Sequence, residues 1–99
     1  MVHVLVSIKM DPEIIDEFLE VYLSAKERKY PDFIKKLHQW VVPDYKIKGY
    51  TVYEIPDEKV VDGLKAINKR YSSYIKVKGY KYKIEVLLEG AEALSLWRK

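Results

Sequence analysis

The chain of 99 residues contains no cysteine and only four glycines. Without cysteine there can be no disulfide, thiolate nucleophile or thiolate metal site. The glycines stand at positions 49, 63, 79 and 90, and none belongs to a loop that cradles phosphate groups. No nucleophile-elbow motif supports a Ser-His-Asp hydrolase. We therefore expect no nucleotide hydrolysis, no metal and no cofactor.

Long apolar stretches are also missing, since no run reaches the 18 residues of a membrane-spanning helix. The segment Met1 to Leu5 has neither the basic lead nor the cleavage site of a secretory signal. We expect a cytoplasmic protein with one domain over residues 1–99. Asn68 is the only asparagine and Gln39 the only glutamine, a poverty typical of thermophilic proteins when Lys and Glu are abundant.

Positive charge is concentrated in the middle of the chain. The net charge is +3, but residues 1–44 carry six Lys/Arg against eight Asp/Glu, and residues 45–83 carry ten against four. Most such lysines are solvated surface residues. An anionic partner is the alternative interpretation.

Two periodicities divide the chain into strands and helices. Alternating apolar residues indicate strands, and apolar residues at steps of three and four indicate helices with one buried face. Helix starts are indicated by Asp11-Pro12-Glu13 and by Pro56-Asp57-Glu58. The predicted strands cover 2–9, 37–42, 46–55 and 75–88. The predicted helices cover 11–28, 56–74 and, as a short C-terminal helix, 93–97.

The sequence Lys46-Ile47-Lys48-Gly49-Tyr50 recurs almost unchanged as Lys76-Val77-Lys78-Gly79-Tyr80. Each copy opens a predicted strand, and a helix lies between them. A right-handed β-α-β unit makes the two strands parallel. In the second copy, the inward-facing residues change from odd positions before Gly79 to even positions after it, which predicts a bulge at Gly79.

The order β-α-β-β-α-β predicts an α+β ferredoxin-like sandwich. Two helices cover one face of a four-stranded antiparallel sheet, and the first strand lies between the third and fourth. The covered face takes the even residues of the first strand and Tyr82, Ile84 and Val86. Tyr50 and Tyr80 are also expected beneath the helices.

The other face of the sheet is open, and any function should be sought there. It is expected to carry His3, Leu5, Ser7 and Lys9 on the central strand. Its neighbours contribute Lys81, Lys83, Glu85 and Leu87 on one side and Thr51 and Tyr53 on the other. The edge strand adds either His38, Trp40 and Val42 or Leu37, Gln39 and Val41.

The second hairpin supplies the most specific resemblance. Trp40 precedes the turn, Gly49 follows it, and Val52-Tyr53-Glu54 leads into Pro56. This pattern resembles the dimeric α/β-barrel superfamily, in particular small members without an assigned activity. The resemblance implies a homodimer whose sheets pack face to face around a lumen. Its enzymes include monooxygenases acting on quinols or haem and lactone isomerases, but no signature of those subfamilies is present.

Three functional hypotheses follow. The first is a homodimer that binds a small apolar or aromatic molecule between the sheets, or serves structural association only. Its pocket would be lined by His3, Leu5, Ser7, Trp40, Tyr53 and Glu85. The second is an enzyme of the same fold, with His3 as a base oriented by Glu85. Neither hypothesis includes a membrane partner.

The third hypothesis is an RNA- or DNA-binding domain. Lys48-Gly49-Tyr50 resembles the Lys/Arg-Gly-aromatic run on the third strand of RNA-recognition motifs, whose exposed rings stack on bases. Thr51 and Val52 depart from that pattern, and the first strand has His3 where a stacking aromatic is usual. The lysines concerned would be Lys46, Lys48, Lys76, Lys78, Lys81 and Lys83.

Overall fold

The computed structural model describes residues 1–25 and 30–98. The strands are β1 (Val2–Met10), β2 (Lys35–Pro43), β3 (Ile47–Ile55) and β4 (Lys81–Leu87). The helices are α1 (Ile15–Ala25), α2 (Val60–Ser72) and α3 (Gly90–Trp97). Short 3-10 turns, η1 (Pro12–Ile14) and η2 (Asp57–Lys59), precede α1 and α2. The predicted end of the first helix near Arg28 lies outside the described residues.

The four strands form one sheet in the order β2-β3-β1-β4, and every neighbouring pair is antiparallel. Since β3 and β4 both run antiparallel to β1, they are parallel to each other. The α+β class, the antiparallel sheet and the position of β1 between β3 and β4 are therefore confirmed.

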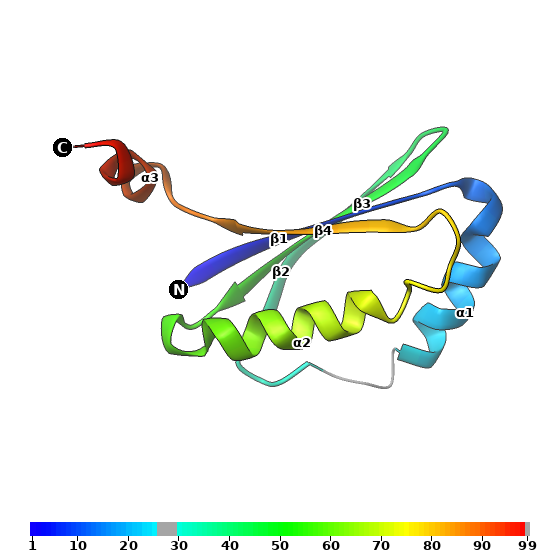
Figure 1. The fold of residues 1–99 in the computed structure, drawn as a ribbon, viewed down its shortest axis with the longest axis horizontal. Helices are drawn as coiled ribbons and strands as arrows, with labels where there is room; N and C mark the ends of the chain where they lie inside the picture. Colours follow the sequence, from blue (N-terminus) through cyan, green and yellow to red (C-terminus); the bar gives the residue numbers. More distant parts are fainter. Residues whose placement is uncertain (26–29, 99) are drawn as a thin grey trace.

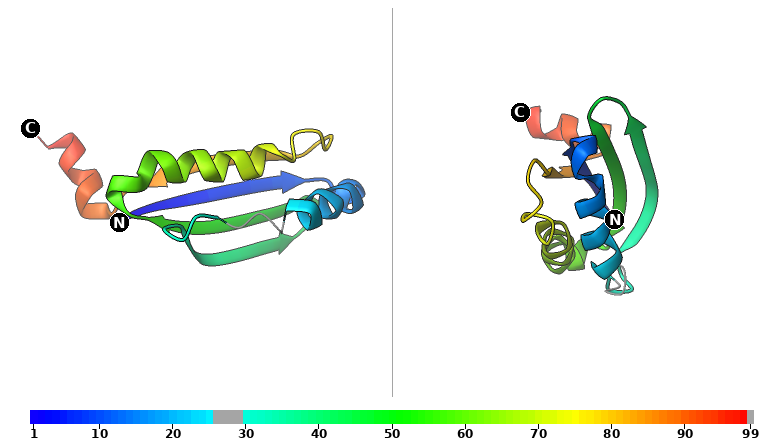
Figure 2. Two further views of the ribbon diagram at one scale, coloured as in Figure 1. Left: turned by 90° about the horizontal axis from the view of Figure 1, so that it is seen from below. Right: turned by 90° about the vertical axis from the view of Figure 1, so that its right-hand side faces the viewer.

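Helices α1 and α2 pack against the same face of this sheet. In Figure 1, α2 runs lengthwise beneath the strands and α1 lies at the end of the sheet, and Figure 2 gives the same arrangement from two other sides. Ile67 of α2 is fully buried in a cluster with Val4, Val6 and Ile55. The predicted inward direction of the even residues of β1 is confirmed by Val4, Val6 and Met10, which are almost inaccessible to solvent.

A second cluster joins α1 to the segment before β4. Met10, Tyr74, Val77 and Tyr80 form its buried centre. Phe18 of α1 stacks on Tyr74 and Tyr80, with ring centroids 4.8 and 5.9 Å apart. This aromatic contact anchors α1 to the end of the sheet.

Residues 75–80 were wrongly predicted as the start of the last strand. They form turns, in which the amide of Val77 bonds to the carbonyl of Tyr74 and the amide of Tyr80 to the carbonyl of Val77. Gly79 has a φ of 85°, a left-handed conformation that favours glycine. The irregularity in strand pairing lies instead in β2, between Lys36 and His38. The two Lys-Gly-Tyr copies therefore differ in structure.

The predicted phase of β3 is also wrong. Thr51 and Tyr53 lie opposite Val6 and Val4 on β1, so they face the helices and are buried. Tyr50 lies opposite Ser7 and therefore belongs to the open face. Tyr80 was correctly expected in the core.

Helix α3 confirms the predicted short C-terminal helix and projects beyond the end of β4 (Figure 1). Its large apolar side chains are largely exposed, with 66% of Leu94 and 76% of Trp97 accessible.

Candidate functional site

Three tyrosines from three segments meet beneath the sheet. Tyr53 projects from β3, Tyr71 from α2 and Tyr30 from the connection that precedes β2. The hydroxyl oxygen of Tyr53 lies 2.8 Å from that of Tyr71 and 3.2 Å from that of Tyr30. The rings of Tyr30 and Tyr53 meet edge to face at 5.3 Å. The guanidinium of Arg70 lies over the Tyr30 ring, 4.9 Å from its centroid.

Two of these phenols, Tyr30 and Tyr53, have a raised pKa. Removal of water around the hydroxyl groups raises the pKa of Tyr30 and, most strongly, of Tyr53. The neighbouring phenols raise the pKa of Tyr53 further, because a phenolate there would be repelled by negative charge on them. We call the contacting hydroxyl groups of Tyr30, Tyr53 and Tyr71 the three-tyrosine chain; a phenol in it can donate a hydrogen bond to a bound molecule.

These tyrosines line a cavity of about 480 Å³ between the helices and the sheet. We call it the helix-face cavity. Its walls come from β1, α1, β2, β3 and α2. The apolar part of the wall consists chiefly of Ile8, Met10, Ile15, Phe18, Leu19, Val41 and Ile47. The volume falls in the range of small-molecule sites, which are about 300–1,000 Å³.

Strand register gives the cavity one apolar end and one polar end. Ile47, Gly49, Thr51 and Tyr53 follow one another along β3 on the cavity side. Ile47 is paired with Met10 and Pro43, whereas Tyr53 is paired with Lys36. The two cations and the three hydroxyl groups in contact therefore lie at the Tyr53 end, whereas the opposite end is lined by Met10 and Ile47 together with the rings of Tyr22 and Tyr74.

Small residues keep the helix-face cavity open at its middle. A Cβ added to Gly49 would lie 2.8 Å from Cγ1 of Ile8, so a larger residue there would push Ile8 aside. Thr51 follows on the same strand and is buried. The space in front of β3 thus depends on short side chains at two alternate positions.

The residues predicted to form one pocket lie on two faces of the sheet. His3, Leu5, Ser7 and Glu85 share the open face, as their paired positions on β1 and β4 require. Trp40 also shares that face, where its ring stacks on His38 at 4.9 Å. Tyr53 points the other way, into the helix-face cavity, so it was wrongly grouped with the others. Trp40 borders both regions, because it belongs to the edge strand.

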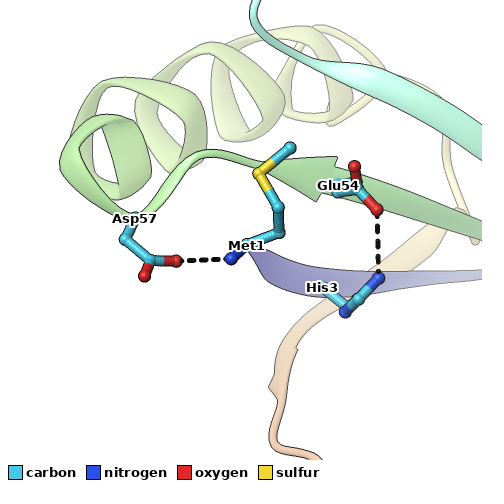
Figure 3. A network of polar contacts seen from close by, with 4 residues as sticks. All are labelled: Met1, His3, Glu54 and Asp57. Atoms are coloured by element: carbon cyan, nitrogen blue, oxygen red, sulfur yellow. Dashed lines mark ion pairs between the residues drawn. The ribbon is translucent and has the colours of Figure 1, made fainter.

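His3 is paired with a different carboxylate from the one predicted. Its Nε2 atom lies 3.3 Å from Oε2 of Glu54, which stands opposite it on β3 (Figure 3). Glu85 stands opposite Leu5, and its carboxylate lies 3.8 Å from the Lys83 ammonium. Beside this pair, the Met1 ammonium lies 2.9 Å from Asp57 (Figure 3). These contacts are on the open face and at its margin, away from the three-tyrosine chain.

The six lysines of the nucleic-acid hypothesis do not form one surface. Lys48 and Lys81 share a row of the open face, on either side of Lys9, and Lys83 lies in the next row. Lys46 makes an ion pair with Asp11. Lys76 and Lys78 are exposed in the turn before β4. Nucleic-acid binding stays a prediction, and its support is the group of lysines that shares the open face with Tyr50.

Within the described residues, no group of three His, Cys, Asp or Glu side chains is placed to hold a metal ion. None of the helices in that part of the chain is long and apolar enough to cross a membrane.

No protein-family model and no curated protein sequence matches this chain. Among solved structures, it is similar to the de novo designed protein Foldit4, with a TM-score of 0.57 and 11% sequence identity. The match covers 89% of this chain and 97% of the designed one. At that identity, the likeness concerns the fold alone.

The nine tyrosines of the sequence carry one signal for the helix-face cavity. The predictions for Tyr50, Tyr53 and Tyr80 concerned only the face of the sheet on which each ring lies. A buried phenol normally finds a hydrogen-bond partner, so several inward tyrosines predict a shared polar contact.

Proposed function

We propose that this protein binds a small, largely apolar molecule in the helix-face cavity. The observation that carries the proposal is the combination of a largely apolar wall with both charged side chains at one end. Pockets for small molecules have this composition, because apolar area supplies affinity and a few polar groups fix orientation. The proposed ligand site is thus beneath the helices rather than on the open sheet face.

The exposure of α1 supports this proposal. Ile15 and Leu19 line the cavity, yet 40% and 44% of these residues are accessible to solvent. A ligand would cover this apolar area, at a gain of about 25 cal/mol for each Å² removed from water.

A neutral apolar probe tests the proposal. Methyl decanoate should bind the protein, and Leu19→Trp should weaken binding at least about tenfold, since the indole would occupy the mouth of the cavity. The matched control is Leu23→Trp, four residues further along α1, at a position outside the cavity lining. Absence of binding by the wild-type protein, or equal binding by the two variants, would contradict the proposal.

A second proposal concerns the open face and the oligomeric state. We propose that the fold is ferredoxin-like and that two copies associate through their open faces, as in dimeric α/β barrels. The support is the apolar part of that face, where Leu5 and Val52 are paired and Trp40 is 53% exposed. Facing sheets would remove this surface from water.

Solution mass tests the association. The chain of 11.7 kDa should sediment as a dimer at micromolar concentration. Val52→Glu should return it to a monomer, because the new carboxylate would be buried between the sheets. Val61→Glu, at an exposed position of α2, is the matched control. A wild-type monomer would exclude the association without affecting the ligand proposal.

Catalysis remains a separate hypothesis, with the His3–Glu54 pair as the base and its orienting carboxylate. If it is correct, His3→Ala abolishes turnover and leaves the oligomeric state unchanged.

A further inference from the structure

We infer that the natural ligand of the helix-face cavity is an elongated apolar acid whose carboxylate lies at the Tyr53 end. The inference rests on the proposed function of the cavity. It adds the chemical class of the ligand and the direction in which the molecule lies. Three observations support it: the hydrogen count of the three-tyrosine chain, the charge of the lining and the order of side chains along β3.

The three-tyrosine chain has one more hydroxyl hydrogen than its internal contacts use. Each phenol donates one hydrogen, and the chain contains two contacts, Tyr30 with Tyr53 and Tyr53 with Tyr71. Each contact uses one hydrogen, so one remains for an acceptor outside the chain. The raised pKa values of Tyr30 and Tyr53 keep these groups protonated. A carboxylate offers only acceptor oxygens and therefore suits this donor.

The charge of the cavity favours an anion. Among the described residues that line it, the charged ones are Lys36 and Arg70, both cations. Both belong to the polar end, since Lys36 is paired with Tyr53 and Arg70 lies over the ring of Tyr30. An arginine beside phenolic donors is well suited to a carboxylate, which accepts several charge-assisted hydrogen bonds.

The order of side chains along β3 sets the shape of the ligand. From Ile47 to Tyr53 the cavity side of the strand covers six residue steps, or roughly 20 Å at about 3.3 Å per residue. The opposite wall, formed by Ile15, Phe18 and Leu19, is apolar. An alkyl chain or a similarly extended apolar body fits this space when the acid group is at the Tyr53 end.

A pair of probes that differ only in the head group tests this inference. Decanoic acid should bind the wild-type protein at pH 7 about 10- to 100-fold more tightly than methyl decanoate, since hydrogen bonds to charged groups are the stronger ones. Tyr71→Phe and Arg70→Gln should each weaken binding of the acid at least about fivefold more than they weaken binding of the ester, because the ester carries no charge and makes weaker hydrogen bonds. Tyr45→Phe, at the exposed hairpin turn, should change neither.

The outcomes separate the inference from the proposed function. Equal affinity for the acid and the ester would overturn the acidic head group while leaving an apolar ligand site intact. Failure of both probes to bind would overturn the ligand site itself and the inference with it. Arg70→Gln removes none of the three hydroxyl groups, so it still tests the inference if Tyr71→Phe fails to fold.

Discussion

The hydroxyl oxygen of Tyr53 lies 2.8 Å from that of Tyr71, which joins the central region of the sheet to helix α2. Tyr53 also contacts Tyr30, so one side chain connects three segments of the chain. The same contact closes the polar end of the helix-face cavity. One group of phenols thus connects these segments and also lies at the proposed ligand site.

Tyr53→Phe should lower the free energy of unfolding by about 1–3 kcal/mol, because both neighbouring hydroxyls lose their partner in a buried site. Urea unfolding of the variant and the wild-type protein measures this difference. Tyr45→Phe is the control, since 79% of Tyr45 is exposed at the hairpin turn. A change below about 0.5 kcal/mol for Tyr53→Phe would show that the three-tyrosine chain does not stabilise the fold.

Tyr80→Phe should have the opposite effect. In the described part of the chain, the buried hydroxyl of Tyr80 has no hydrogen-bond partner, while its ring packs on Phe18 and Tyr74. Removing an unsatisfied hydroxyl while keeping the ring should leave the free energy of unfolding unchanged or raise it by up to about 1 kcal/mol. A loss of more than 1 kcal/mol would indicate that this hydroxyl is hydrogen-bonded, for example to water.

Gly63→Ala should destabilise the protein although alanine is the better helix former. The added Cβ would lie 2.6 Å from Cδ1 and 2.9 Å from Cγ2 of Ile55, a fully buried residue. The resulting overpacking should cost about 1–3 kcal/mol. Ile55→Val removes Cδ1, so the double variant should lose less stability than the two single variants added together. Additive losses in this double-mutant cycle would contradict the contact.

Alkaline pH should weaken the fold through the buried tyrosines. Their pKa values are raised in the folded protein, so the stability linked to them is complete below the unfolded pKa of about 10. Above that pH the unfolded chain loses protons that the folded chain keeps, and each tyrosine lowers stability by up to about 1.4 kcal/mol per pH unit. Urea unfolding between pH 9 and 11 should show a smaller decline for Tyr53→Phe than for the wild-type protein. Identical slopes would contradict the raised pKa of Tyr53.

Much of the fold could be predicted from periodicity, because β1 alternates cleanly and α2 repeats its apolar residues at helical steps. The phase of β3 could not, because both of its faces mix polar and apolar residues. Val52 and Tyr50 look as suitable for a core as Thr51 and Tyr53. Pairing with β1 decides between them, and pairing depends on contacts distant in sequence.

The segment 75–80 was misassigned for a related reason. Ile75 and Val77 have strong strand propensity, but Ile75 is exposed and Val77 is buried, so packing of Val77 outweighs propensity. The buried residues Tyr74, Val77 and Tyr80 recur every third position, a spacing typical of turns rather than strands. The cavity could not be predicted either, because it forms where α1, α2 and three strands meet.

Methyl NMR of the protein during titration with decanoic acid tests the central claim most directly. Ile8 and Leu19 line the helix-face cavity, whereas Leu5 and Leu87 lie on the open face. Ligand binding in the cavity should shift the methyl signals of Ile8 and Leu19 in a saturable manner and leave those of Leu5 and Leu87 in place. Shifts confined to Leu5 and Leu87 would instead locate the ligand on the open face and contradict the proposed site.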